Sequence, residues 1–476
     1  MVFSSVSFLF YFLPLFLLAY AALPFRNATL LLFSTLFYLW GEGIFIAVLF
    51  VSVAINYVAG LLIDREDTTK GRRRWLAAGI VANLALLFYY KYCGFLINDV
   101  LQITSVSPDA IPHLPLGISF FTFQSLSYLF DVYRKDAKCE RSFWNLALYI
   151  MMFPQLIAGP IVRYKSIARQ INTRVVHYNY VRYGLWFFSV GLSQKVLIAN
   201  NAGALADRLF ALPLEQLSTT IAWLATLSYT LQIYFDFAGY SNMAIGLGLI
   251  MGFKFPRNFN YPYISQSITE FWRRWHISLS SWFRDYVYIP LGGNRKGPAR
   301  TYFNLLVVFF LCGLWHGAAW SFVVWGMYHG VILIIERAGL LRLLSALPQV
   351  FRHLYTMLAV MIGWVFFRAE SLEQAMAFLS HMFGVGQSTH AVPAIVELST
   401  NQQRVAMVFG LVAATPLTSR FFAYLAIDVD TTSIVRGRTL KRYQHIVVMA
   451  AVVLLLYINA SYVASGTYNP FIYFRF

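Results

Sequence analysis

The chain has 476 residues, of which 59% are hydrophobic and 12% charged, and its mean hydropathy is +0.60. Soluble domains are about half apolar and about a quarter charged, so this composition excludes an ordinary soluble protein and favours a membrane protein. The net charge of +17 does not require nucleic acid as a partner, because Lys and Arg collect in the cytoplasmic loops of chains that cross a membrane many times. We therefore expect contact with the lipid bilayer and none with nucleic acid.

Apolar runs follow one another along the chain, near the length that a helix needs to cross a hydrocarbon core of about 30 Å. The clearest occupy residues 5–23, 44–63, 75–95, 219–237, 302–315, 321–335 and 446–460. The first run has no convincing signal-peptide cleavage site, so we interpret it as a retained helix. The pattern predicts an all-α polytopic membrane protein with about 11–13 transmembrane helices, plus re-entrant or interfacial helices, in a single domain over residues 1–476.

One apolar stretch, residues 142–161, conflicts with a simple crossing. Basic residues lie on both sides of it, and both sides cannot face the cytoplasm if the stretch crosses once. It also contains Pro154 and the pair Gly159 and Pro160, which interrupt helices. Irregular backbone at membrane depth is tolerated only where protein buries it or where it lines a wet cavity. The sequence therefore predicts a re-entrant or broken segment and, with it, a cavity.

The segment over residues 228–253 carries an ionisable residue, Asp236, inside an apolar run. Such a residue within the membrane is a functional candidate by default. We weigh two interpretations of Asp236, a structural pairing with an arginine or a backbone amide and a direct role in catalysis, and we favour the structural pairing.

The segment over residues 255–301 is too polar to span a membrane but is rich in aromatic residues. At about 100° per helical residue, seven side chains share one face of an amphipathic helix that should lie in or near the membrane interface with this face inward. Arg273 and Arg274 point away from this face. The seven are Trp272, Trp275, His276, Leu279, Trp282, Phe283 and Tyr286.

His316 lies in the apolar sequence "GLWHGAAWSFVVWGMYHG", flanked by Trp315 and Gly317. A neutral imidazole suits proton exchange, and burial without a charged partner keeps the ring a free base. Such a base can take the proton of an alcohol that attacks a thioester, in surroundings that exclude water. The alternative is a structural histidine bonded to a carbonyl. His329 would lie about 220° away on a continuous helix, and we expect it to be mainly structural.

Two long motifs in order, "FWRRWHISLSSWFRDYVYIPLGGNRKG" and "GLWHGAAWSFVVWGMYHG", resemble the membrane-bound O-acyltransferase family. The resemblance is nearest to the bacterial branch that acts in alginate O-acetylation, and it covers nearly the whole chain. The opening "MVFSS" and four further runs also match that branch. These runs are "PLGISFFTFQSLSYLFDVYR", "PQLIAGPIVR", "YFDFAGYSNMAIGLGLIMGF" and the closing "PFIYFRF".

The resemblance implies a many-helix membrane core around a central tunnel or funnel that meets near a buried histidine. It implies His316 as the catalytic histidine and His276 as the second family histidine, within a motif region over residues 228–337. We add as candidate supporting residues Asp236, Trp275, Trp315, Arg273 and Arg274.

The reaction that the resemblance implies is transfer of an acetyl group from a cytoplasmic thioester, acetyl-CoA, to a hydroxyl. The chain would work in the bacterial inner membrane, without a metal or a permanently bound cofactor. It would pass acetyl groups to a periplasmic acetyltransferase or acetyl-carrier protein, or towards an exported polysaccharide such as alginate.

Two positions depart from the branch. Asn242 and Asn200 stand where Asp is expected. The histidines remain, so the chemistry is retained, but any role of those carboxylates in tuning a nearby base is in doubt. The departures also leave open a polysaccharide other than alginate.

Two other classes of function compete with the enzyme. A transporter or flippase would use the broken segments as a permeation path, but we find no internal repeat of the kind that many transporters have. A non-catalytic scaffold of an export complex would carry inert histidines. The basic residues near the second histidine either hold the phosphates of coenzyme A or anchor the chain to anionic headgroups, and we favour the headgroups. They are Arg273, Arg274, Arg284, Arg295 and Lys296.

Overall fold

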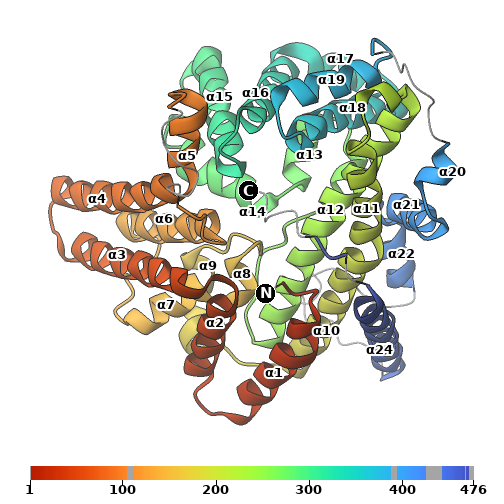
Figure 1. Cartoon of the computed structure of the whole chain (residues 1–476). Coiled ribbons are helices and arrows are strands. Elements are labelled where there is room, and N and C mark those ends of the chain that lie inside the picture. The colour runs from red at the N-terminus through yellow and green to blue at the C-terminus, as the bar shows by residue number, and fades with distance from the viewer. Residues whose placement is uncertain (1, 104–111, 387–393, 425–441, 467, 471–476) are drawn as a thin grey trace. The chain divides into compact units, whose positions relative to one another are not determined.

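The computed structural model describes residues 2–103, 112–386, 394–424, 442–466 and 468–470. Every regular element in these ranges is a helix, which confirms the all-α class (Figure 1). Apart from Pro470, the closing motif lies outside the described residues. By its internal contacts the chain divides into two compact units. The first is Met1–Phe188 with Met243–Pro256, and the second is Ser189–Asn242 with Arg257–Phe476. The single domain over residues 1–476 stays a prediction.

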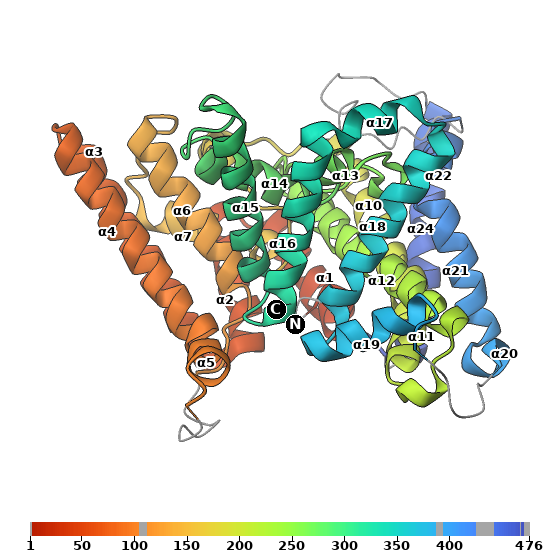
Figure 2. The same ribbon diagram turned by 90° about the horizontal axis from the view of Figure 1, so that it is seen from above.

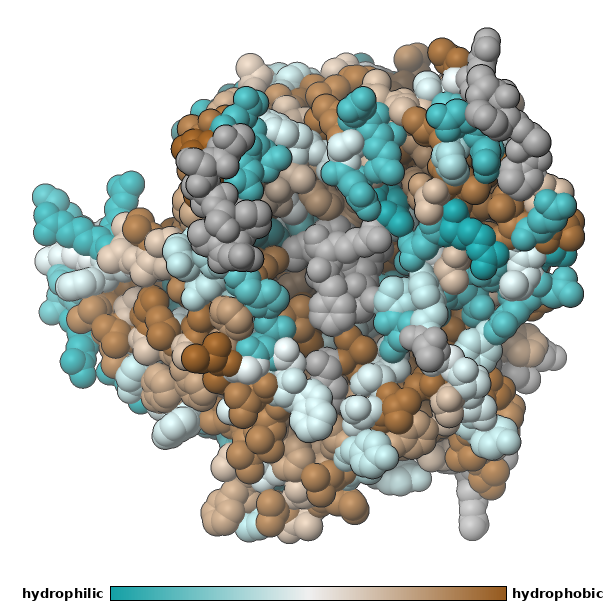
Figure 3. Space-filling model, viewed as in Figure 1, coloured by the Kyte–Doolittle hydropathy of each residue, from teal (hydrophilic) through white to brown (hydrophobic). Residues whose placement is uncertain are grey.

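The first unit is built from the N-terminal helices. In this unit α3, α4 and α6 pack on one another, and Figure 2 shows α3 and α4 running side by side. Hydrophilic residues gather at the tip where α3 ends and α4 begins, with hydrophobic residues along the helices beside it (Figure 3). The helices are α1 (Leu13–Ala22), α2 (Arg26–Glu42), α3 (Ile46–Arg65), α4 (Thr69–Leu87), α5 (Cys93–Phe95), α6 (Ile118–Arg134), α7 (Phe143–Met151), α8 (Phe153–Leu156), α9 (Tyr164–Thr173) and most of α10 (Tyr178–Ser193).

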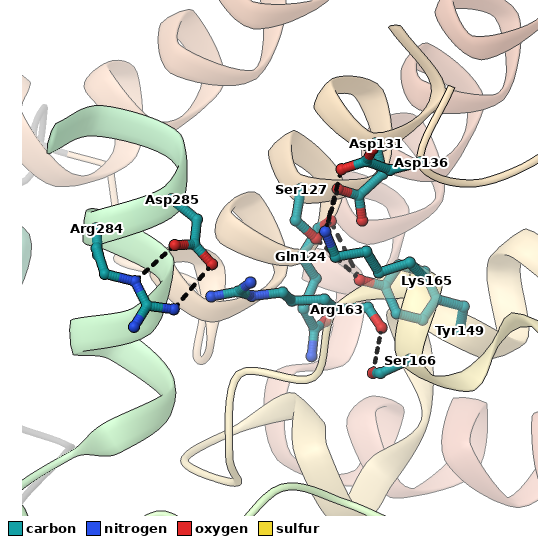
Figure 4. A network of polar contacts seen from close by, with 10 residues as sticks. All are labelled: Gln124, Ser127, Asp131, Asp136, Tyr149, Arg163, Lys165, Ser166, Arg284 and Asp285. Atoms are coloured by element: carbon teal, nitrogen blue, oxygen red, sulfur yellow. Dashed lines mark hydrogen bonds and ion pairs between the residues drawn. The ribbon is translucent and has the colours of Figure 1, made fainter. Parts of the chain in front are cut away.

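The stretch predicted to be interrupted is interrupted. Helix α7 ends at Met151, the short α8 follows, and the chain then continues without helix to Arg163. The Tyr149 hydroxyl lies 2.9 Å from the carbonyl oxygen of Val162. It also lies 3.2 Å from the carbonyl oxygen of Gln124 (Figure 4). The break is therefore buried in protein, which is where irregular backbone is tolerated at membrane depth.

The second unit contains the motif region. Helix α12 starts in this unit, and its residues after Asn242 belong to the first. Helices α15, α16 and α18 lie side by side (Figure 2). The helices are α11 (Asn200–Phe210), α12 (Thr219–Ile250), α13 (Ile268–Arg274), α14 (Ile277–Phe283), α15 (Gly297–His316), α16 (Trp320–Ile335), α17 (Leu341–Ala346), α18 (Gln349–Arg368), α19 (Leu372–Met382), α20 (Ile395–Leu398), α21 (Asn401–Ala413), α22 (Leu417–Tyr424) and α24 (Arg442–Ser465).

Two glycines set the spacing of α15 and α16. A Cβ on Gly313 would collide with the carbonyl of Phe322, and one on Gly326 would collide with the carbonyl of Phe309. Small residues of this kind let helix backbones approach closely in membranes. The close approach fixes the relative position of the two helices that carry His316 and His329.

Within the described residues, five helical segments are long and apolar enough to cross a membrane. They bear out a polytopic membrane protein, while the total of about 11–13 crossings stays a prediction for the shorter helices. The segments are Arg26–Arg65, Thr69–Val100, Gly297–His316, Gln349–Arg368 and Ile446–Ser465.

The predicted amphipathic helix around His276 is not continuous. Helix α13 ends at Arg274, His276 has left-handed backbone angles (φ 43°, ψ 55°), and α14 starts at Ile277. The helical interpretation was wrong at this point because a distant loop takes over the backbone bonds. The amide of Ile277 donates to the carbonyl of Asn258 at 2.9 Å. The predicted inward face is nevertheless correct, because all seven of its side chains are buried.

Candidate active site

His276 lies at the break between α13 and α14, outside the candidate membrane spans, and its side chain is completely buried. Its Nδ1 lies 3.0 Å from Oδ1 of Asn258. The imidazole stands edge-on to the ring of Phe237 with centroids 4.5 Å apart, and 6.0 Å from the ring of Trp315. Burial lowers the pKa of His276 from 6.5 to about 3, so the ring is neutral.

Asn258 makes four hydrogen bonds around this histidine with its side chain. Besides Nδ1 of His276, its Oδ1 accepts from the hydroxyl of Ser278 at 2.9 Å and from the backbone amide of Ser278 at 3.3 Å. Its Nδ2 donates to the hydroxyl of Ser241 at 2.9 Å. Asn258 and Ser241 are themselves buried, so this polar group is enclosed by protein.

His316 is the last residue of α15 and is 4% exposed. Aromatic rings surround it: Trp315 at 4.8 Å, Trp325 at 5.0 Å and Phe367 at 5.1 Å between centroids. The next residue is Gly317, where a Cβ would collide with the ring of Phe322. The histidine is thus positioned by packing at a helix end.

The ring of Trp315 contacts both predicted histidines. His276 and His316 are 40 positions apart in the sequence (316 − 276), yet their ring centroids lie 6.0 Å and 4.8 Å from that of the same indole. Low polarity around an imidazole favours its neutral form and strengthens the electrostatic interactions it makes with a reactant. The arrangement has the geometry of a buried acid–base site.

Trp275, the residue before His276, anchors the break in an aromatic cluster. Its ring lies 4.9 Å from that of Trp364, 5.1 Å from that of Phe259 and 5.5 Å from that of Phe271. Aromatic pairs at such distances contribute about 0.5–1.5 kcal/mol each beyond the area they bury. Trp275 therefore supports the site by holding the backbone of His276, and its indole is directed into this cluster.

Asp236 forms a buried ion pair with Lys195, with 2.6 Å between Oδ1 and Nζ and side chains 2% and 3% exposed. Lys195 also donates to the carbonyl of Pro470. A structural pairing, the interpretation that we favoured, is present, and its charged partner is a lysine where an arginine was expected. Asp236 directly precedes Phe237, whose ring contacts His276, so the pair anchors one wall of the site.

The two candidate supporting arginines, Arg273 and Arg274, lie in different surroundings. Arg274 donates to the carboxylate of Glu270 at 2.8 Å and to the carbonyl of Asn260 at 3.0 Å. Arg273 is exposed and makes no hydrogen bond or ion pair with any described residue. Farther along, Arg284 pairs with the adjacent Asp285 at 2.7 Å (Figure 4). Of these three, Arg273 alone presents a guanidinium not engaged with other described side chains.

His329 is buried in α16, with its ring 5.2 Å from Trp272 and 5.3 Å from Trp325. A Cβ on Gly363 would come within 2.7 Å of its Nε2, so the space beside the imidazole is filled by backbone. Because the chain turns between α15 and α16, His316 and His329 pack against the same indole of Trp325. The expectation that His316 and His329 point in different directions was based on one continuous helix, and it does not hold because they lie on two helices.

The two asparagines found where Asp was expected make hydrogen bonds within the second unit. Asn242 donates to Oε1 of Gln194 at 2.8 Å, and Asn200 donates to the carbonyl of Tyr468 at 3.3 Å. Neither bond is to a histidine.

The sequence reasoning missed two groups of polar residues. One is the set of Asn258, Ser241 and Ser278, which carried no signal because its members are common residues in separate segments. The other is Lys91, a buried lysine in the span Thr69–Val100 that lies 3.1 Å from the hydroxyl of Ser119. A lone lysine inside the apolar run 75–95 was a visible signal for a functional position.

No cluster of three or more His, Cys, Asp or Glu side chains suited to a metal ion occurs among the residues that the structure describes. The three cysteines are free thiols. Near neutral pH an imidazole is the side chain best suited to exchange a proton, so His276 and His316 are the acid–base candidates of this site.

The sequence model of the MBOAT, membrane-bound O-acyltransferase family matches residues 140–373, which include both histidines. The chain is 43% identical over 504 aligned positions to "Probable alginate O-acetylase AlgI" of Azotobacter vinelandii and 42% identical over 498 to the protein of that name in Pseudomonas putida. Both alignments cover 100% of each chain. It is also 38% identical to "Peptidoglycan O-acetyltransferase" of Helicobacter pylori, over 81% of this chain and 80% of that one.

Proposed function

This chain belongs to the membrane-bound O-acyltransferase family and is an acyltransferase, and we propose that it transfers acetyl groups from acetyl-CoA towards the hydroxyls of an exported polysaccharide, alginate or one close to it. The full-length similarity to proteins named alginate O-acetylase supports an acetyl group and a polysaccharide. The relative named for peptidoglycan shows that similar chains carry names for more than one polymer. The geometric support is that His276 and His316 contact the same buried indole.

In the proposed reaction His316 is the general base. The acceptor oxygen attacks the thioester carbonyl carbon while His316 removes the proton of the hydroxyl. The tetrahedral intermediate then expels the thiolate of coenzyme A, which takes that proton from the imidazolium. Base assistance of this kind accelerates reactions by about 10²–10⁴-fold. His276 positions or polarises one of the two reactants, and the aromatic surroundings keep out the water that would hydrolyse the donor.

The setting that we propose is the bacterial inner membrane, with the donor in the cytoplasm and the acceptor on the periplasmic side. The multi-pass character of the chain supports a membrane enzyme of this type. A periplasmic acetyltransferase or an acetyl-carrier protein would then receive the acetyl group or deliver it to the polymer. Arg273, exposed on α13, is available either to the phosphates of coenzyme A or to anionic headgroups.

The experiment that tests this function compares His316→Ala with the wild type in a strain that lacks the gene, with matched protein levels in the membrane. The measurement is the acetyl content of the exported polysaccharide. We expect loss of acetyl groups with normal polymer export. His177→Ala, which changes an exposed histidine in the first unit, is the matched control and should leave acetylation unchanged.

Other outcomes would favour the competing functions. Normal acetylation with His316→Ala would exclude His316 as the base and favour a scaffold. Loss of the polymer itself would favour a transporter or flippase, because export and not acetylation would then depend on this chain.

A further inference from the structure

The orientation of the Asn258 side chain is fixed by a donor that cannot change its role. The backbone N–H of Ser278 points to Oδ1 of Asn258 at 3.3 Å, and a backbone N–H only donates. A flipped amide would place its NH₂ group against this N–H. The oxygen of Asn258 therefore faces Ser278 and His276, and its NH₂ group faces the hydroxyl of Ser241 at 2.9 Å.

This orientation determines which nitrogen of His276 carries the proton. Nδ1 of the ring lies 3.0 Å from Oδ1 of Asn258, and an amide oxygen has no proton to give. Nδ1 must therefore be the donor. A neutral imidazole carries one N–H, so its Nε2 has a lone pair. Nε2 makes no hydrogen bond to any described residue.

The ring is neutral because burial disfavours its charged form, and no described residue forms an ion pair with it. Among the described residues its neighbours are the rings of Phe237 on α12 and Trp315 on α15 and the amide of Asn258. Asp236, the carboxylate next to Phe237 in the sequence, is paired with Lys195. A carboxylate in the place of Asn258 would stabilise an imidazolium, whereas an amide fixes the tautomer without adding charge.

We propose that Asn258 is a positioning residue that holds His276 as the Nδ1–H tautomer, so that Nε2 accepts a hydrogen bond from a hydroxyl of the acceptor next to the reacting one and cannot donate one to the thioester carbonyl. This proposal rests on the proposed acetyl transfer, and it decides which reactant His276 serves. Polarising the donor carbonyl needs an N–H directed at its oxygen. A lone pair on Nε2 repels that oxygen and attracts the O–H of an alcohol.

The backbone supports the same arrangement. The backbone carbonyl of Asn258 accepts a hydrogen bond from the backbone amide of Ile277 at 2.9 Å. Its side chain accepts one from the ring of His276, the residue before Ile277. His276 has a left-handed backbone (φ 43°), a conformation that costs free energy in a non-glycine residue and that clusters at functional sites. Asn258 thus fixes both the direction of the ring and its protonated nitrogen, and the proton of the reacting hydroxyl is left for His316.

The test uses the full chain in lipid nanodiscs with ¹⁵N-labelled histidine. The His276 signals are identified by their loss in His276→Gln, and their ¹⁵N shifts distinguish the two tautomers. We expect Nδ1–H in the wild type and in Ser278→Ala, and a mixture with Nε2–H in Asn258→Leu. Adding de-O-acetylated alginate oligosaccharide should move the Nε2 signal, and adding acetyl-CoA alone should leave it unchanged.

Kinetics supply a second readout. In Asn258→Leu the KM for the oligosaccharide should rise about 10-fold, as for one lost hydrogen bond, while the KM for acetyl-CoA stays within about 2-fold. Asn258→Asp keeps an acceptor for Nδ1–H, so it should restore the oligosaccharide KM but add an acidic limb to the pH profile.

Three results would overturn the proposal: an Nε2–H tautomer in the wild type, an Nε2 signal that moves with acetyl-CoA or with neither reactant, or a KM effect on acetyl-CoA alone. Failure of the proposed function looks different. The protein would then show no acetyl transfer at all, while the tautomer would still be read from the ¹⁵N spectrum.

Discussion

His276 and His316 contact the same indole but are held in opposite ways. His276 lies at a break between two helices, and hydrogen bonds to Asn258 from its own ring and from the backbone amide of Ile277 orient it. His316 lies at the end of an unbroken helix and packs against the rings of Trp325 and Phe367. The directional bond to Asn258 gives His276 a defined tautomer, whereas the surrounding rings hold His316 in place by shape. This difference matches the proposed roles of His276 as a group that binds a reactant and of His316 as the base.

The largest expected effect is a loss of activity that distinguishes His316 at the end of α15 from His329, the buried histidine of α16. His316→Gln should lower kcat for acetyl transfer by about 10²–10⁴-fold, because glutamine cannot take a proton. His329→Gln is the matched control, since His329 is equally enclosed and also packs on Trp325. We expect it to retain activity within about 10-fold of the wild type, as for one altered packing or polar contact. Equal losses in the two variants would remove the distinction between them.

A smaller effect should come from the ion pair behind His276. Asp236→Ala leaves Lys195 buried without its carboxylate, which typically lowers the free energy of unfolding by about 3 kcal/mol. Thermal unfolding in detergent measures this change. The double variant Asp236→Leu with Lys195→Met removes both charges and should recover much of the stability. A double variant as unstable as the single one would show that the pair is needed for more than charge balance.

The effect that is smallest for each step of one pH unit is the pH dependence of stability. Because the pKa of His276 is lowered to about 3 in the folded chain from 6.5, protonation favours the unfolded state. The stability from neutral His276 is fully present above pH 6.5 and falls as the pH drops from 6.5 towards 3, at up to about 1.4 kcal/mol per pH unit.

The measurement is the pH dependence of thermal unfolding in the wild type and in His276→Gln. The slope below pH 6.5 should be smaller in the variant, because one group fewer takes up a proton on unfolding. Identical slopes would mean that His276 is protonated equally in the folded and unfolded states.

Much of the fold followed from local sequence. The break near Pro154 was predicted because proline and glycine act on their own neighbours, and the buried face over residues 272–286 was predicted because helical periodicity survives a single kink. The kink at His276 was not predictable, since it depends on a backbone bond from Ile277 to Asn258. Lys195 as the partner of Asp236 was hidden for the same reason, because 41 positions separate them (236 − 195).

In the candidate site, too, features that depend on local sequence could be predicted and features that depend on distant contacts could not. His316 and His276 were identified through motifs, and their meeting on Trp315 requires the packing of α13, α14 and α15 that no local pattern contains. Asn258 gave no signal at all, because an asparagine in a polar loop is ordinary until its amide is seen against a histidine.

The left-handed backbone of position 276 also restricts which amino acids can stand there. Asn, Asp and His are several-fold enriched among non-glycine residues with positive φ, whereas β-branched and bulky side chains are outliers there. These three are also short or planar side chains that can accept a hydrogen bond. The backbone angle therefore limits the substitutions that position 276 can accept. Apart from glycine, those that the main chain tolerates best keep a hydrogen-bond acceptor beside Trp315.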